Sequence, residues 1–271
     1  MTDLRLWHQS LTDLGLLDAY QRGLTEHLTD VVTDDVVVDV HGMSSGTYTT
    51  PYPGSRIHQV YLQSLHKEQF VSAALTAESA GYDGMIIATI PDLALEECRS
   101  LVDIPVVGFG EASFKVASML GGVIGVVSFD IEPLEPQLRR NAERYGVGSL
   151  LGPMTDAKAS FDDVVDGLAG GDAGKVVRAV TEAGRELIAR GAQVIVPGPG
   201  PMNLLVARQR LTRIDDVPVI DSLRASAEMC AMLARMRRAG VYPSRRGFYW
   251  AKPERAQVAA AREVYGLATP R

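Results

Sequence analysis

His41 is a candidate for proton transfer near neutral pH, because histidine is the side chain whose ordinary pKa lies closest to neutrality. It follows the run VVVDV at residues 36–40, which predicts a strand. Asp39 lies two residues earlier and so on the same strand face, where its carboxylate could orient the imidazole. The alternatives are that His41 hydrogen-bonds only loop backbone and that Asp39 caps a neighbouring helix. The position at a strand end makes His41 a candidate general acid–base.

The stretch PGPGP at residues 197–201 places a rigid turn directly after the apolar strand residues VIV at 194–196. Proline and glycine have no side chain for proton transfer, but they provide shape, backbone carbonyls and glycine amides. We therefore expect Gly198, Pro199 and Gly200 to form the wall of a binding site and a partial nest for an anion. A tight structural turn explains the same residues, and both interpretations can hold together.

The elements that would position these residues alternate between strands and helices. The predicted strands are continuous apolar runs at residues 36–40, 84–89, 105–110, 123–129, 194–196 and 218–221. Such runs, separated by helical stretches, indicate parallel sheets covered by helices on both faces. Residues 3–30 are expected to form one or two short amphipathic helices on the surface.

The chain contains an internal repeat. GYDGMIIAT at residues 81–89 aligns with GAQVIVPGP at 191–199, and DIPVVGFGEAS at 103–113 aligns with DVPVIDSLRAS at 216–226. Gly81 sits where a glycine that ends a helix belongs. Two similar βαβ units indicate two pseudo-symmetric lobes. Ligands of such sheets bind beyond the carboxyl ends of the strands, so Thr89 and Pro199 are predicted to face each other across one cleft.

Five motifs in order carry a family resemblance: YDGMIIATIPD, LVDIPVVGFGEAS, LGGVIGVVS, GAQVIVPGPGPM and VPVIDS. Together they resemble the aspartate/glutamate/hydantoin racemase superfamily over residues 36–240. The resemblance implies an α/β fold of two Rossmann-like lobes with parallel sheets, an active site in the cleft between the lobes, and no cofactor. In racemases of that family, one cysteine ends each of two paired strands. One thiolate removes the α-proton and the other thiol returns a proton on the opposite face.

Both of these cysteine positions differ in this sequence, since they fall on Thr89 and Pro199. A threonine hydroxyl is too weak an acid to serve as a resting base, and proline carries no side-chain proton. The two cysteines present, Cys98 and Cys230, fall within predicted helices and are expected to be packing residues. Two-base racemisation by thiols is therefore not expected. Thr89 can still donate a hydrogen bond to a carboxylate or a developing oxyanion.

The resemblance also implies further site residues. His41 takes the place of the first asparagine of a substrate loop, and Ser44 and Ser45 match its hydroxyl residues, which offer hydrogen bonds to a substrate carboxylate. Asp92 coincides with an acidic residue after the first cysteine, or else it caps the helix that follows. The other candidates are Tyr48 and Arg56 in the loop and Glu111, whose alternative role is structural at a helix N-terminus.

Other kinds of site are poorly supported. His58 and His66 lie eight residues apart, but no cysteine or acidic residue accompanies them in a metal-ligand pattern. The GFG motif lacks the rest of a dinucleotide fingerprint, and no Walker loop is present. The net charge of −6 without a basic run argues against nucleic acid or anionic membrane as the main partner. Neither a signal peptide nor a membrane span is evident, which together with two cysteines predicts a cytoplasmic protein.

The predicted layout has four parts. These are an N-terminal helical extension (1–35), a first lobe (36–130 with 215–240), a second lobe (131–214) and a tail (241–271). The tail mixes arginines with aromatic residues, a composition of interfaces, so we expect a homo-oligomer in which it covers a neighbouring subunit or folds over the cleft. A surface helix with a strapping segment is the alternative.

The leading hypothesis is a cofactor-independent enzyme that acts on a small carboxylate, imide or cyclic ureide by non-cysteine chemistry. Bond cleavage by a lyase or hydrolase is preferred, because it needs a stabilised oxyanion or enolate but no second proton carrier. The alternatives are a racemase or isomerase that uses His41 and a carboxylate or water, and a non-catalytic protein that binds a small molecule.

Overall fold

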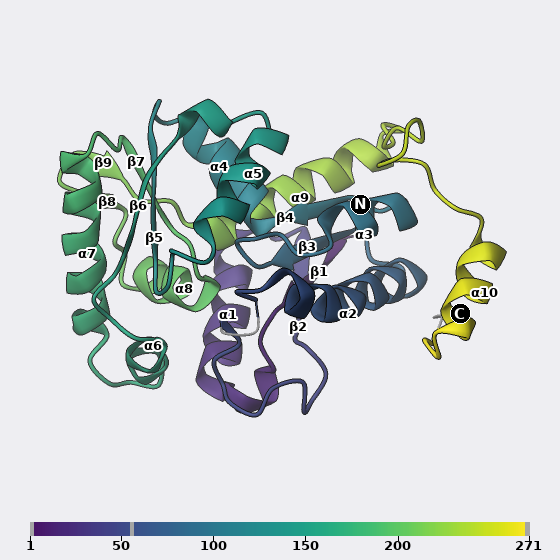
Figure 1. Cartoon of the computed structure of the whole chain (residues 1–271), viewed down its shortest axis with the longest axis horizontal. Helices are drawn as coiled ribbons and strands as arrows, with labels where there is room; N and C mark the ends of the chain where they lie inside the picture. Colours follow the sequence, from purple (N-terminus) through teal and green to yellow (C-terminus); the bar gives the residue numbers. More distant parts are fainter. Residues whose placement is uncertain (1–2, 55–56, 269–271) are drawn as a thin grey trace.

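The computed structural model describes residues 3–54 and 57–268, which form two α/β lobes lying side by side (Figure 1). The strands are β1 (Leu4–Ser10), β2 (Val36–His41), β3 (Gly84–Ala88), β4 (Val106–Gly108), β5 (Ile124–Ser128), β6 (Leu151–Asp156), β7 (Val194–Pro197), β8 (Arg213–Ile214) and β9 (Val217–Pro218). The α-helices are α1 (Asp18–Val31), α2 (Val60–Ser79), α3 (Leu95–Leu101), α4 (Phe109–Ser118), α5 (Glu135–Arg144), α6 (Phe161–Leu168), α7 (Ala173–Ala189), α8 (Gly200–Arg208), α9 (Ser222–Arg238) and α10 (Arg255–Val264).

The sheet of the first lobe has the order β2-β1-β3-β4 with all neighbours parallel. Strand β1 lies inside this sheet, so the prediction that residues 3–30 are helical is wrong for residues 4–10 and holds only for α1. The segment LRLWHQS mixes polar and apolar residues and gives a weak local signal. It forms a strand because β2 and β3 pair with its two edges, and both partners are distant in sequence.

The sheet of the second lobe has the order β6-β5-β7, and a parallel bridge from Ile195 to Val219 adds a fourth position beside β7. This repeats the arrangement of the first lobe, so the predicted α/β fold of two pseudo-symmetric lobes with parallel sheets is confirmed. Gly81 and Gly191 precede β3 and β7 at equivalent places, and both have a positive φ (+77° and +97°). Glycine adopts this conformation without steric cost, which explains why each helix before these strands ends there.

The two lobes exchange chain segments. Strand β5 belongs to the second sheet, so the first lobe ends before residue 124 rather than at residue 130. Helix α9 crosses back and packs on α4, β3, β4 and β1 of the first lobe, whereas β9 and Val219, which precede it, lie beside β7 in the second lobe. Asp221 begins α9 by accepting a hydrogen bond from the amide of Arg224, and it also lies 2.9 Å from His27 of α1.

The tail runs along the first lobe, and α10 is seen in yellow at one end of the molecule (Figure 1). It contacts α2, where the buried Arg262 donates hydrogen bonds to Glu68 at 2.6 Å and to Ser72 at 2.8 Å. In the single chain the tail therefore straps the outer face of the first lobe. Within residues 3–54 and 57–268, no helix has both the length and the apolar character needed to cross a membrane.

Candidate functional site

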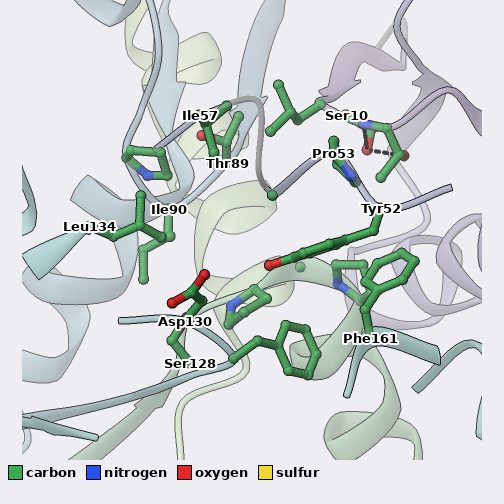
Figure 2. A pocket seen from close by; sticks show the side chains of 18 of the residues that line it. Ser10, Tyr52, Pro53, Ile57, Thr89, Ile90, Ser128, Asp130, Leu134 and Phe161 are labelled. Carbon is green, nitrogen blue, oxygen red and sulfur yellow. Dashed lines mark hydrogen bonds between the residues drawn. The ribbon is translucent and has the colours of Figure 1, made fainter. Parts of the chain in front are cut away.

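A pocket lies between the lobes at the carboxyl ends of their strands. Ser10 ends β1, Thr89 follows β3, Ser128 ends β5, and Pro199 follows β7. Thr89 and Pro199 thus line one pocket, as the internal repeat predicted. The space of about 640 Å³ includes the open solvent at its mouth. Figure 2 shows the two serines, Thr89 and a set of apolar side chains around this space.

Thr89 carries an unpartnered hydroxyl into this region. Its residue is 5% exposed, and its Oγ1 has no hydrogen-bond partner among the described residues. Buried hydroxyl groups are nearly always hydrogen-bonded in folded proteins, so an unsatisfied one at a pocket wall is available to a ligand. The Ser10 hydroxyl differs, because it lies 2.7 Å from the Thr12 hydroxyl and accepts a hydrogen bond from the Thr12 amide at 3.2 Å.

The PGPGP turn forms the opposite wall and begins α8. Pro199 precedes the first residue of α8, and Gly200 and Pro201 supply its first turn at the pocket. The first amides of a helix have no acceptor within the helix, and they carry the positive end of its dipole. A side chain at Gly200 would approach the Tyr20 hydroxyl to 3.1 Å, so glycine keeps this wall open. Gly198 does not line the pocket, since it packs on Ile90 instead.

Asn203 holds this turn in place. Its buried amide nitrogen donates to the carbonyl oxygens of Pro197 and Ile220, at 3.1 and 3.0 Å. Its amide oxygen accepts from the Ser222 amide at 3.0 Å. One side chain thereby joins the end of β7 to the start of α9. The turn is both a structural junction and a pocket wall, so both interpretations of PGPGP apply.

His58 and Asp130 form a pair at the pocket. His58 comes from the loop before α2, Asp130 follows β5, and the histidine Nδ1 lies 3.5 Å from the carboxylate. The histidine Nε2 is buried and has no hydrogen-bond partner among the described residues. The Nδ1 atom thus faces the carboxylate, while Nε2 has no partner in the part of the chain that the structure describes. The pair joins the two lobes and can transfer a proton at the pocket.

His41 lies outside the pocket, which corrects its predicted place. Strand β2 is the edge strand of the first sheet, and the strand next to the cleft is β1, which ends at Ser10. The His41 ring stacks on Trp7 with centroids 3.4 Å apart, and burial lowers its pKa. Asp39 does not hydrogen-bond His41, because its carboxylate accepts from Arg5 at 3.0 Å and from Tyr82 at 2.7 Å.

The loop after β2 also differs from the prediction. Ser44 and Ser45 are exposed and do not line the pocket, and the Ser44 amide donates to Gln69 of α2 at 2.8 Å. Tyr48 is buried against His66, and burial raises its pKa. The later part of the loop lines the pocket instead, with Tyr52, Pro53, Gly54, Ile57 and His58. Arg56 lies outside the described residues.

Asp92 holds the start of α4 and does not line the pocket. It has a positive φ of 49°, and its carboxylate accepts from the amides of Gly110 and Glu111 and from the Tyr145 hydroxyl, at 2.8, 2.7 and 2.6 Å. It therefore caps α4 and not the helix that directly follows it. Burial raises its pKa to about 7, against the opposing effect of the Tyr145 hydrogen bond.

Glu111 is also structural in its contacts. It is paired with Arg99 and with Lys115, the latter at 3.1 Å, and it lines a hollow beside α9 rather than the pocket between the lobes. Burial acts to raise its pKa, but the two cations outweigh burial and the net pKa is lowered. Its predicted role at the substrate is not supported by its position.

The two cysteines are packing residues, as predicted. Cys98 and Cys230 are fully buried, and their sulfurs lie 3.5 Å from the carbonyl oxygen of Phe70 and 3.7 Å from that of Met85. Burial raises the pKa of both thiols, which keeps them protonated. Neither residue lines the pocket. Across the described residues, no group of three or more histidine, cysteine, aspartate or glutamate side chains is arranged to hold a metal ion.

Sequence reasoning missed Ser10, Tyr52, His58, Ser128 and Asp130. Ser128 and Asp130 directly follow a predicted strand, so the strand-end rule could have found them. The sequence pattern predicts a helix over residues 4–10, so Ser10 does not fall at a predicted strand end. His58 and Tyr52 come from a loop, and the sequence holds no signal that brings this loop back to the strand ends.

Comparison with known families places residues 19–230 within the profile described as Asp/Glu/Hydantoin racemase. Comparison with curated proteins gives no match.

Solved structures with the same fold include two allantoin racemases. The enzyme from Klebsiella pneumoniae is 22% identical with a TM-score of 0.75, covering 93% of this chain and 95% of the other. The enzyme from Pseudomonas fluorescens is 18% identical with a TM-score of 0.71, covering 93% and 97%. A variant of arylmalonate decarboxylase is 16% identical with a TM-score of 0.50, covering 85% and 93%. At these identities the likeness concerns the fold.

Proposed function

Because the chain belongs to the Asp/Glu/hydantoin racemase family, we propose that it is an enzyme whose active site is the pocket between the lobes. Its substrate is a small carboxylate, imide or cyclic ureide, and its reaction is cleavage of a C–C or C–N bond without thiol chemistry. The observation that carries this proposal is the composition of the pocket. One histidine–carboxylate pair lies beside an unpartnered hydroxyl and a helix N-terminus, and both thiols lie elsewhere.

The first part of the mechanism is stabilisation of negative charge. Thr89 Oγ1 can donate a hydrogen bond, and the N-terminus of α8 at Gly200 adds its dipole. Groups fixed in this way favour an oxyanion or enolate as it forms, since they need no reorganisation during the reaction. The substrate carbonyl or carboxylate oxygen therefore lies between Thr89 and Gly200.

The second part is proton transfer by His58, with Asp130 at its Nδ1 and the Nε2 free for the substrate. The tyrosines at the pocket are poor partners for this step, because burial raises the pKa of Tyr20 and of Tyr52. Cleavage followed by protonation requires only one such group, whereas isomerisation requires carriers on both faces of the reacting carbon. This supports a lyase or hydrolase.

An isomerase is the second candidate, because two of the most similar folds are allantoin racemases. His58 would serve one face and water or Asp130 the other. His41 is not the proton carrier in this candidate, because it stacks on Trp7 at the sheet edge.

The test is turnover in heavy water of a panel of malonates, hydantoins, allantoin and succinimides, followed by NMR and chiral chromatography. A lyase that breaks a C–C bond gives a product with deuterium on the carbon that loses its substituent, and a hydrolase gives the ring-opened product with its C–H bonds unchanged. In both cases the unreacted substrate keeps its α-hydrogen. Exchange of that hydrogen with loss of optical purity would identify the isomerase instead. His58→Gln and Thr89→Val should each lower the rate at least about 100-fold. Ligand binding without turnover of any panel member would leave a binding protein.

A further inference from the structure

One part of the pocket wall is built from aromatic rings. Tyr52 and Phe161 have ring centroids 4.9 Å apart, and Phe129 lies 6.5 Å from Tyr52 and 6.3 Å from Phe161. The three rings come from the loop before α2, from the segment after β5 and from α6. They therefore meet from both lobes at a single place, and all three line the pocket.

Aliphatic side chains complete this surface. Ile57, Ile90 and Leu134 each have an exposed fraction of 6% and line the same space. Figure 2 shows the Tyr52 ring extending across the pocket, with Phe161 beside it and with its hydroxyl on the side of Asp130. The rings meet edge to face and at a tilt, which is the usual geometry of aromatic contacts.

The Tyr52 ring lies close to the backbone of Gly54. A Cβ at Gly54 would lie 2.0–2.6 Å from ring atoms of Tyr52, so the ring folds back directly over that glycine. Only a residue without a side chain permits this arrangement. Glycine at position 54 therefore permits the observed position of the Tyr52 ring.

We propose that the substrate carries a flat apolar substituent, most simply an aromatic ring, which binds against Tyr52, Phe129 and Phe161 while its polar head group lies at Thr89 and Gly200. This inference rests on the proposed function for the position of the head group. It adds what the family does not specify, namely that this pocket selects for an aryl side chain over a short or charged one. The three rings determine this selectivity.

The experiment compares ligands that share a head group and differ only in their substituent. Benzyl, methyl and carboxymethyl derivatives of hydantoin and of succinimide are titrated into the full-length protein by calorimetry. The benzyl member of each set should bind at least about tenfold more tightly than the methyl member, because its ring is removed from water. The carboxymethyl member should bind most weakly, since the wall that it meets is apolar.

Variants connect this preference to the three rings. Phe161→Ala and Phe129→Leu should each reduce the ratio of benzyl to methyl affinity to about one third or less, and Gly54→Ala should do so by displacing Tyr52. Phe248→Ala is the matched control, because this phenylalanine is 89% exposed and lies outside the pocket, and it should leave the ratio unchanged. Circular dichroism identifies any variant that fails to fold, and Phe161→Leu then replaces Phe161→Ala.

The outcomes separate this inference from the proposed function. Equal affinities for benzyl and methyl members in the wild type, or an unchanged ratio in folded Phe161 and Phe129 variants, would overturn the aromatic site. His58-dependent turnover of methyl or carboxymethyl compounds in that case would still support the enzyme. Selective binding of benzyl members without turnover would instead support the aromatic site and refute the proposed catalysis.

Discussion

Replacing Tyr145 by phenylalanine should destabilise the protein more at alkaline pH than at acidic pH. The Tyr145 hydroxyl donates to the Asp92 carboxylate at 2.6 Å and is one of three donors to it, with the amides of Gly110 and Glu111. Burial raises the pKa of Asp92 to about 7 despite these bonds. Phenylalanine keeps the ring of Tyr145 and removes one donor, so it acts on the ionised form of Asp92.

The size of the effect follows from the charge on Asp92. A hydrogen bond to an ionised group contributes about 1.5–3 kcal/mol, and one between neutral groups about 1 kcal/mol. Loss of the bond therefore costs the ionised form of Asp92 more than the neutral form. At about 1.4 kcal/mol per pKa unit, this raises the pKa of Asp92 in the variant by roughly one further unit. The folded-state pKa already exceeds the unfolded value of about 4, so the contribution of Asp92 to stability falls as the pH rises from there to about 7. In the variant this fall continues to about pH 8.

The assay is urea unfolding of wild type and variant at about pH 5.5 and about pH 9. The loss in unfolding free energy should be about 1 kcal/mol at the lower pH and about 2–3 kcal/mol at the higher pH. Tyr265→Phe is the control, because Tyr265 is 80% exposed, and it should change neither value by more than about 0.5 kcal/mol. Equal losses at both pH values, or a larger loss at the lower one, would refute the description of Asp92 as a buried carboxylate held by Tyr145.

Three further results are expected. Asp130→Asn should lower turnover about tenfold or more, because the ion-pair partner of Asp130 is His58. Its unfolding free energy should stay within about 0.5 kcal/mol of wild type, because Asp130 is half exposed. Equal turnover in both proteins would exclude a role of Asp130 in the reaction. Iodoacetamide should leave Cys98 and Cys230 unlabelled and activity intact in the native protein, with mass spectrometry detecting both adducts only in denaturant. Asn203→Ala should lower the unfolding free energy by about 3 kcal/mol in urea titrations, since its buried amide joins β7 to α9; a loss below about 1 kcal/mol would contradict that role.

The sequence predicted the lobes well because each strand of the repeat carries a strong local signal. Strands β3, β5 and β7 are buried on both faces and are therefore continuous apolar runs. The glycines before β3 and β7 mark equivalent helix ends. Since a ligand of such sheets binds at the strand ends, the same patterns also predicted that Thr89 and Pro199 meet at one pocket.

The incorrect site predictions concern residues whose distance from the cleft depends on the order of strands in the sheet. His41 does end a strand, as predicted, but β2 lies at the sheet edge and β1 separates it from the cleft. Strand order depends on pairing between distant segments, and no local pattern in LRLWHQS reports it. His58 was noted only as a poor metal ligand, because the return of its loop to the pocket depends on tertiary contacts. The polar residues of the site were thus less predictable than the strands and helices that position them.

The pseudo-symmetry of the lobes makes their chemical differences informative. Ser10 and Ser128 end equivalent strands, β1 and β5, and are the same residue type. The neighbouring strands end differently, with a hydroxyl at Thr89 and an open helix N-terminus at Pro199. Two unlike hydrogen-bonding groups on opposite walls can hold one oxygen as its charge grows, but they cannot exchange protons as two equal carriers would. This asymmetry supports the proposed reaction, in which charge gathers on one oxygen and His58 is the single proton carrier.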